Sequence, residues 1–272
     1  MVRYETIIRV MKEETLKCQT TGKNLHKGIR ENFKRFYEKY GQLEHEELDM
    51  MDEHGNILYH KVGKLTGVDP EYEDSLKEEY YGRTHALHNH PEGMATIPPG
   101  LSDGDVSQLL MRNDNGSIHP YWTTNETSDY IVRSITATSP NGGRMTLIRG
   151  NEFPGKWFGH EDAARTLTLI PTYYRGYYDR FIGNYKLQAR NELRNYPKSE
   201  WQGLIESPDF HEKISKKTID NIGTLEEYYR DVGVYDNLEK IDCKLEIEEG
   251  TGYDPAYDSK LDFEVMTAVE GL

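Results

Sequence analysis

The stretch LHNHPEGMATIPPGLSDGDVSQLL, residues 87–110, constrains the fold of this chain more than any other part of it. The compact apolar segment that leads into it, residues 84–88, predicts a buried strand that runs directly into two histidines. Side chains alternate along a strand, so His88 and His90 should point to the same face. Pro91 ends the strand, and the loop rich in proline and glycine can return the chain sharply without regular hydrogen bonds. We therefore expect the start of the next helix to lie over the end of this strand.

The helix expected after the loop provides a third polar group. Ser102 is a good N-cap for a helix that continues through Met111 and ends at the segment NDNG. Asp105 lies on the first turn of this helix, where it can fold back over the strand end. Zinc hydrolases usually take three protein ligands from His, Asp or Glu and leave a fourth position for water. We therefore predict that His88, His90 and Asp105 bind Zn²⁺, and a surface histidine pair beside an ordinary helix N-cap is the alternative.

Other potential ligands fit this site less well. His85 precedes His88 by an odd spacing along the strand, so its side chain should point to the other face. Cys18 and Cys243 are the only cysteines, and they are far apart with no C-x-x-C pair. The sequence therefore disfavours both a disulfide framework and a zinc site built from thiolates.

The rest of the chain divides into helical and strand-like segments. Residues 3–40 have the pattern of two helices, and residues 48–63 alternate as a hairpin about the turn DEHGN. Two further strands, residues 130–138 and 144–149, are joined by a Pro-Asn-Gly-Gly turn. Residues 160–194 have a helical pattern with a tyrosine stripe at spacings of three and four, which is typical of a buried helix face.

The clearest boundary in the chain is the segment punctuated by Pro154 and Gly155. A short helix is expected before the histidine strand, over residues 72–80. After residue 194 the chain looks helical and then acidic and loop-like. We predict a helical lead-in, a compact domain, and a mainly helical C-terminal region with an acidic tail, over residues 1–43, 44–155 and 156–272.

Charge and hydropathy exclude several classes of function. The chain has 33 basic and 47 acidic residues, a formal net charge of -14, and no long run of Lys or Arg, so nucleic acid is disfavoured as a partner. No apolar stretch approaches the roughly 20 residues needed to cross a bilayer, and the N-terminal segment lacks the features of a secretory signal. We therefore expect a cytoplasmic protein that does not act at a membrane.

The sequence HNHP followed by S-x-x-D resembles the signature of the JAMM (MPN-plus) metalloprotease family, in the form seen in RadC-like and bacterial or phage-associated JAB domains. The resemblance covers about residues 44–155. It implies an α+β fold with a mixed, cytidine-deaminase-like sheet flanked by helices, to which this chain adds N-terminal helices and a C-terminal extension. It also implies that His88, His90 and Asp105 are the metal ligands and that Ser102 helps to hold the oxyanion. Eleven residues separate His90 from Ser102, a longer loop than the usual motif has.

The resemblance also implies an upstream glutamate at the start of a strand. This residue takes a proton from the attacking water and later donates it to the leaving amine. The stretch EHEELDMMDEHGNILYHKVG is similar to the corresponding hairpin in phage and toxin-associated members of the family. We prefer Glu46 as the base because it shares its face with Leu48 and Met50, and Glu47 and Glu44 remain alternatives.

These features predict a zinc-dependent hydrolase that cleaves a peptide or isopeptide bond with a metal-activated water. The partner would be a protein or peptide substrate. The alternative is a noncatalytic MPN-like scaffold or interaction module in a phage, toxin or mobile-element system, and the complete ligand set favours the enzyme. A DNA-processing role, which the RadC likeness suggests, is disfavoured by the charge balance.

Overall fold

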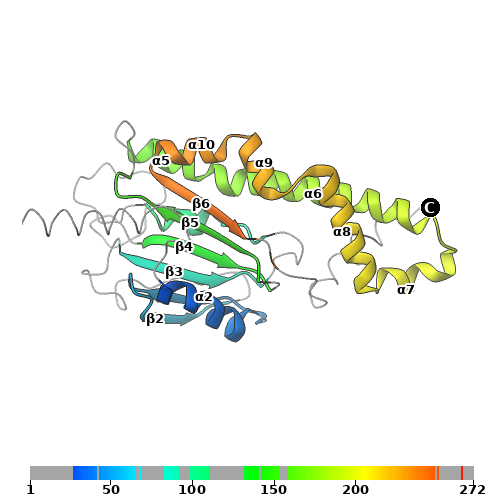
Figure 1. The fold of residues 1–272 in the computed structure, drawn as a ribbon, viewed down its shortest axis with the longest axis horizontal. Helices are drawn as coiled ribbons and strands as arrows, with labels where there is room; N and C mark the ends of the chain where they lie inside the picture. Colours follow the sequence, from blue (N-terminus) through cyan, green and yellow to red (C-terminus); the bar gives the residue numbers. More distant parts are fainter. Residues whose placement is uncertain are drawn as a thin grey trace, which may run out of the picture.

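The computed structural model describes residues 27–41, 43–64, 68, 83–91, 98–110, 132–140, 142–153, 159–248, 250 and 265. These residues form a mixed α+β fold in which helices lie on both sides of a sheet (Figure 1). The elements in chain order are α2 (Lys27–Tyr40), β1 (Glu47–Met51), β2 (Ile57–Val62), β3 (Thr84–Asn89), α4 (Asp103–Ser107), β4 (Val132–Thr138), β5 (Arg144–Arg149), α5 (His160–Leu167), α6 (Leu169–Leu193), the 3-10 helix η3 (Lys198–Glu200), α7 (Trp201–Ile205), α8 (Pro208–Ile222), α9 (Leu225–Asp231), α10 (Val234–Lys240) and β6 (Cys243–Glu248).

The six described strands lie in the order β2-β1-β3-β4-β5-β6. β3 and β4 are parallel, and each of the other neighbouring pairs is antiparallel. Several predicted segments lie wholly or partly outside the described residues. They are residues 3–26 of the helical lead-in, residues 72–80, the first two residues of the strand predicted over 130–138, the boundary at Pro154 and Gly155, and most of the acidic tail after residue 248.

Both predicted hairpins, β1–β2 and β4–β5, are present. In the first, Asp52 Oδ1 accepts hydrogen bonds from the backbone amides of His54 and Asn56 at 2.9 and 2.8 Å. Gly55 follows with a φ of 88°, a conformation that favours glycine. The segment DEHGN thus forms a turn because an aspartate satisfies its amides and a glycine allows the chain to reverse.

The larger hydrophobic core lies between one face of the sheet and the helices α4, α5, α6, α9 and α10, and it continues past the end of the sheet between α6, α7 and α8. Leu48, Ala86 and Leu147 point into it from three different strands. The tyrosine stripe of α6 lies against this core, and Tyr177 and Tyr185 are both almost completely buried there. The sheet and the C-terminal helices therefore share one core.

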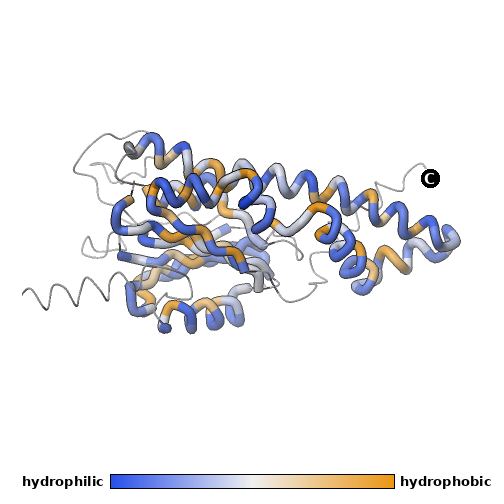
Figure 2. Tube along the Cα trace, turned by 45° about the horizontal axis from the view of Figure 1, so that its top comes forward, coloured by the Kyte–Doolittle hydropathy of each residue, from blue (hydrophilic) through white to orange (hydrophobic). Residues whose placement is uncertain are grey.

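The opposite face of the sheet is covered in part by α2. Ile29, Phe33 and Phe36 recur at helical spacing along α2 and pack against Met51 and Leu87. Figure 1 shows α2 on the other side of the sheet from α5, α6, α9 and α10. Figure 2 shows apolar residues along the strands and hydrophilic residues recurring along the helices, as expected for helices with one buried face.

Helices α6, α7 and α8 extend past the end of the sheet (Figure 1). Tyr185 Oη and His211 Nδ1 form a hydrogen bond there, and His211 Nε2 donates to the carbonyl of Ile205. His211 is completely buried, so its two bonds join the three helices where no water can replace them. None of the helices in the described ranges is long and apolar enough to cross a membrane.

The helix after the loop is shorter than predicted. α4 spans only Asp103–Ser107, and the amides of Leu109 and Leu110 donate to carbonyls three residues back rather than four. These tighter bonds convert the end of the helix into turns. Met111, through which the helix was expected to continue, lies outside the described residues.

The prediction of a loop-like acidic segment is wrong for residues 243–248, which form the edge strand β6. Cys243 and Leu245 lie on the core side, and Glu246 pairs with Thr146 on the other side. Period-two alternation is present in CKLEIE, but the chain continues into the acidic stretch EIEEGTGYDPAYDSKLDFE, whose composition resembles that of a solvated tail. β5 supplies the hydrogen-bonding partner, so residues beyond the predicted boundary near 155 complete the sheet.

Candidate metal centre

β3 delivers both predicted histidine ligands. His88 is buried and lies opposite Leu48 of β1, and the amide of His90 donates to the carbonyl of Thr138 at 2.8 Å. The strand pairing thus extends to His90, and Pro91 follows. The two imidazole centroids are 4.7 Å apart, and the two Nε2 atoms are 2.9 Å apart. The prediction that both rings share one face is confirmed.

Asp105 reaches both histidines from the first turn of α4. Its Oδ1 is 3.2 Å from His88 Nε2, and its Oδ2 is 3.5 Å from His90 Nε2. The three ligand atoms lie within 4.8 Å of one another, and no other group of three His, Cys, Asp or Glu in the described part of the chain meets this criterion. The structure therefore brings together the three residues that the sequence selected.

The donor set suits a zinc ion. Two facing imidazole nitrogens 2.9 Å apart can share only one proton, whereas a cation between them would accept both lone pairs. Two imidazoles and one carboxylate are a ligand set of catalytic zinc sites, in which a fourth position stays open. His88 Nδ1 is buried without a hydrogen-bond partner among the described residues, although metal-binding histidines usually donate from this nitrogen. The polar contacts of the ring are instead those of Nε2 with His90 and Asp105.

Ser102 fixes the position of the Asp105 carboxylate. The Ser102 hydroxyl and amide both donate to Asp105 Oδ2 at 2.7 Å, and the hydroxyl accepts from the Asp105 amide at 3.1 Å. This reciprocal arrangement is a capping box, so the predicted N-cap role of Ser102 is confirmed. An oxyanion role would require the hydroxyl to turn away from Asp105.

The electrostatic environment keeps Asp105 ionised. Burial acts to raise its pKa, but the neighbouring His88 and His90 outweigh burial and hold the pKa well below its usual range. The carboxylate is therefore negatively charged throughout the physiological pH range. Ionised carboxylates are the form that binds divalent metals, so this side chain needs no proton loss before it acts as a ligand.

Glu46 lies on the metal side of the sheet. It comes two residues before Leu48, the residue opposite His88, so alternation places all three on one face. The half-buried Glu46 carboxylate accepts a hydrogen bond from the amide of Val68 at 3.0 Å. Glu44, the third candidate base, is exposed. The strand register thus favours the preferred glutamate over its neighbours in sequence.

Glu47 belongs to a separate cluster on the α2 face that the sequence patterns did not reveal. Its buried carboxylate lies 2.8 Å from His45 Nε2 and 3.1 Å from His60 Nε2. His60 Nδ1 is 2.7 Å from Asp49 Oδ1, and its ring stacks on Tyr40. Burial raises the pKa of Asp49, and the contact with His60 opposes that increase. A signal for this cluster does exist in the sequence, because Asp49 and His60 are direct partners in the predicted hairpin.

His85 points away from the metal ligands, as predicted. Its Nδ1 is 2.6 Å from Ser134 Oγ on the other face of the sheet. Burial, with a smaller effect from Arg133, lowers the pKa of His85 from 6.5 to about 4. This imidazole is therefore neutral and structural.

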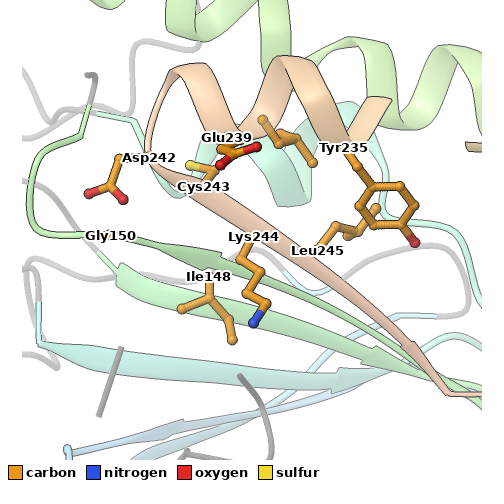
Figure 3. Close-up of a pocket in the computed structure, with 9 residues that line it drawn as sticks. Ile148, Gly150, Tyr235, Glu239, Asp242, Cys243, Lys244 and Leu245 are labelled. Carbon is orange, nitrogen blue, oxygen red and sulfur yellow. The ribbon is translucent and has the colours of Figure 1, made fainter. Parts of the chain in front are cut away.

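A separate cavity of about 320 Å³ lies beside the edge strand β6 (Figure 3). Tyr235 and Glu239 line it from α10, and Lys244 lines it from β6. Burial raises the pKa of the Cys243 thiol in this cavity, so the sulfur is protonated and unreactive. None of the three predicted metal ligands lines the cavity.

No family model matches this chain, and neither a curated protein nor a solved structure shows significant similarity to it.

Proposed function

We propose that this chain is a JAMM-type zinc-dependent hydrolase that cleaves a peptide or isopeptide bond with a metal-activated water. The observation that carries this proposal is the convergence of His88, His90 and Asp105 from a strand end and a helix start. A mixed sheet with helices on both sides is compatible with the cytidine-deaminase-like fold of that family. Zinc is the metal that two imidazoles, one carboxylate and one open position favour.

The residues of this chain divide the chemistry among them. When bound, zinc supplies Lewis acidity, which lowers the pKa of water and polarises a carbonyl group. Glu46 takes a proton from the attacking water and returns it to the leaving amine. The Ser102 hydroxyl stabilises negative charge on the carbonyl oxygen after turning from Asp105. Asp105 stays ionised throughout because its pKa is held low.

The metal is tested first, by elemental analysis of the purified 272-residue chain after loading with zinc and dialysis. We expect about one zinc ion per chain, because the three ligands converge on one point. His88→Ala and Asp105→Ala should each lose the metal. His54→Ala is the control, because His54 is exposed on the β1–β2 turn. A wild-type protein that retains no metal would reject the proposal.

The base is assigned by comparing two neighbouring variants on peptide and isopeptide substrates. Glu46→Gln should retain zinc but lower the cleavage rate by about 100-fold to 10,000-fold, the range for loss of a general base. Glu47→Gln should still cleave, because Glu47 contacts His45 and His60 on the other face. The opposite ranking of the two variants would move the catalytic role to Glu47.

A noncatalytic interaction module stabilised by the metal is the second candidate. Two contacts favour it, since Glu46 accepts from the Val68 amide and the Ser102 hydroxyl donates to Asp105. Both candidate catalytic groups thus have structural partners. For such a module, zinc would bind and increase the free energy of unfolding, no substrate would be cleaved, and Glu46→Gln would leave zinc binding unchanged.

A further inference from the structure

We propose that Tyr174 of α6 is a positioning residue for the third metal ligand, and this inference rests on the metal site of the proposed function. Tyr174 lies in the C-terminal region, beyond the part of the chain that carries the family resemblance. Its hydroxyl donates to the carbonyl of Pro98 at 3.1 Å. Residues 98–101 lead directly into Ser102, whose hydroxyl and amide hold the Asp105 carboxylate. The long helix thereby braces the loop that sets the ligand in place.

The loop is shaped to receive the tyrosine ring. A Cβ on Gly100 would lie 2.5 Å from two carbon atoms of the Tyr174 ring, closer than any side chain tolerates. Gly100 is thus the residue that lets the loop backbone approach the ring. Burial raises the pKa of Tyr174, so its phenol stays protonated and remains a donor to Pro98. The hydrogen bond and the ring contact hold the loop at two adjacent points.

A displacement at this contact would reach the metal ligand, because the intervening chain is short and stiff. The proline rings of Pro98 and Pro99 fix two φ angles, and Leu101 is buried in the core. Only Leu101 separates Gly100 from Ser102, which forms three hydrogen bonds with Asp105. The loop therefore has little freedom to absorb a shift of the ring before the shift moves the Asp105 carboxylate.

The internal hydrogen bonds of α4 give Asp105 only weak support. The helix has five residues, and a helix this short gains little cooperativity from its own hydrogen bonds. α6 has 25 residues and packs into the main core through Tyr177 and Phe181, which makes it the rigid partner of the pair. A second contact, Arg175 to Asp103 at 3.5 Å, is largely exposed and contributes little. Tyr174 thus adds a fixed point on the loop to the core packing that Val106 gives to α4.

The test compares metal binding by Tyr174→Phe with that of the wild-type protein and of Tyr173→Phe. Tyr173 is the matched control because it lies on the same helix and packs edge-on against Tyr228 of α9. Competition with a chelator gives the zinc affinity, and the visible absorption of the Co²⁺-loaded protein reports the coordination geometry. We expect Tyr174→Phe to bind zinc about tenfold more weakly, the lower end for loss of a group that orients a ligand. Its Co²⁺ spectrum should also change, while Tyr173→Phe should match the wild type.

Gly100→Ala provides an independent variant on the loop side of the same contact. The added methyl group must displace the ring or the loop, so we expect a loss of zinc affinity at least as large as that in Tyr174→Phe. Tyr174→Phe removes one oxygen and leaves the packing intact, so it decides the matter if Gly100→Ala does not fold. A purely structural role for Tyr174 would lower the melting temperature and leave the Co²⁺ spectrum unchanged, and that result overturns the inference.

The outcomes separate this inference from the proposed function. If the wild type binds no metal, both are rejected. If the wild type binds zinc and Tyr174→Phe binds it equally well with the same Co²⁺ spectrum, only the positioning role is rejected. If Tyr174→Phe weakens the metal site and no substrate is cleaved by the wild type, the positioning role stands without the hydrolase.

Discussion

His85 and His88 lie three residues apart on β3, and side-chain alternation places them on opposite faces of the sheet. His88 faces Asp105, whereas His85 is buried against Ser134. The same residue type therefore serves as a candidate ligand in one position and as a neutral packing group in the other. The odd spacing along the strand puts the two histidines on different faces, so their different roles could be predicted from the spacing alone.

His85 should make the stability of the protein depend on pH. Its pKa is about 4 in the folded protein and about 6.5 in the unfolded chain, so between these values the unfolded chain binds the proton more readily. Above pH 6.5 His85 is neutral in both states, so its titration does not change the free energy of unfolding. As the pH falls below 6.5 the free energy of unfolding decreases, by about 3 kcal/mol at pH 4. Urea unfolding at several pH values should show a smaller loss for His85→Asn than for the wild type.

The exposed His54 gives the control for this measurement. His54→Asn should keep the pH dependence of the wild type, because its side chain is 64% exposed. Equal losses of stability in His85→Asn and the wild type between pH 7 and pH 4 would contradict the account of His85.

The ligands of the candidate site could be predicted from sequence because each lies within a few residues of a strong local signal. His88 lies near the end of a buried strand and His90 directly follows it, and Asp105 lies three residues after an N-cap. The contact of Tyr174 with Pro98 has no such signal, because the two residues are 76 positions apart and a tyrosine stripe indicates only a buried face. Contacts of this kind depend on how the elements pack.

At the scale of the elements, the β1–β2 turn depends on a glycine that no other residue can replace without strain. Gly55 has a φ of 88°, and a Cβ there would clash with the backbone of Gly28 in α2. We expect Gly55→Ala to lower the free energy of unfolding by about 2 kcal/mol, as for other residues forced into this region. Chemical denaturation of the metal-free protein measures the change.

Gly183 is the matched control for this prediction. It lies in the interior of α6, and a Cβ added there would have nothing within 4 Å, so alanine meets no obstacle. Gly183→Ala should increase the free energy of unfolding by about 0.5 to 1 kcal/mol through helix propensity. Changes of the same sign in both variants would contradict the strain assigned to the turn.

Glu192 joins α6 to α8 through two lysines. Its buried carboxylate lies 2.7 Å from Lys213 Nζ and 2.6 Å from Lys217 Nζ, and these bonds lower the pKa of Glu192. Because folding lowers the pKa of Glu192, the ionised carboxylate stabilises the protein at pH values above the ordinary carboxyl pKa. This stabilisation is lost as the pH falls through the lower pKa of the folded protein. We expect Glu192→Gln to lose about 1 kcal/mol at pH 7, with a smaller difference from wild type in acid or high salt.

Glu212 on the exposed surface of α8 is the matched control for the same charge change. Glu212→Gln should leave the free energy of unfolding nearly unchanged at every pH. A loss in Glu192→Gln that persists undiminished below pH 3 would show that packing, and not the two ion pairs, holds the helices together.

The predicted hairpins were correct because local signals set them, whereas two other predicted elements differ from the structure. The hairpins follow from alternation and turn residues within about a dozen positions, and both are present. Residues 243–248 lead into an acidic stretch that resembles a solvated tail, yet they pair with β5, a strand that precedes the whole helical region in sequence. α4 ends early, because the amides of Leu109 and Leu110 donate to carbonyls three residues back. The helical pattern of the sequence does not predict this change in hydrogen bonding.

At the scale of the whole molecule, one hydrophobic core extends across the division predicted near residue 155. Leu147 of β5 and Leu245 of β6 belong to the same core as Tyr177 of α6. Removal of everything after residue 155 would expose that core and turn β5 into an unprotected edge. It would also remove Tyr174, which braces the loop before the metal ligand.

We therefore expect the fragment 1–155 to lack a cooperative unfolding transition and to bind zinc far more weakly than the full chain. The fragment 156–272 should also be unfolded or only partly helical, because its apolar helix faces would have no sheet to cover. Mixing the two fragments should restore both the transition and zinc binding, since β6 can return to its place beside β5. Circular dichroism and zinc competition measure these changes. If fragment 1–155 alone unfolds cooperatively and retains zinc, the metal site belongs to an independent domain and α6 is dispensable to it.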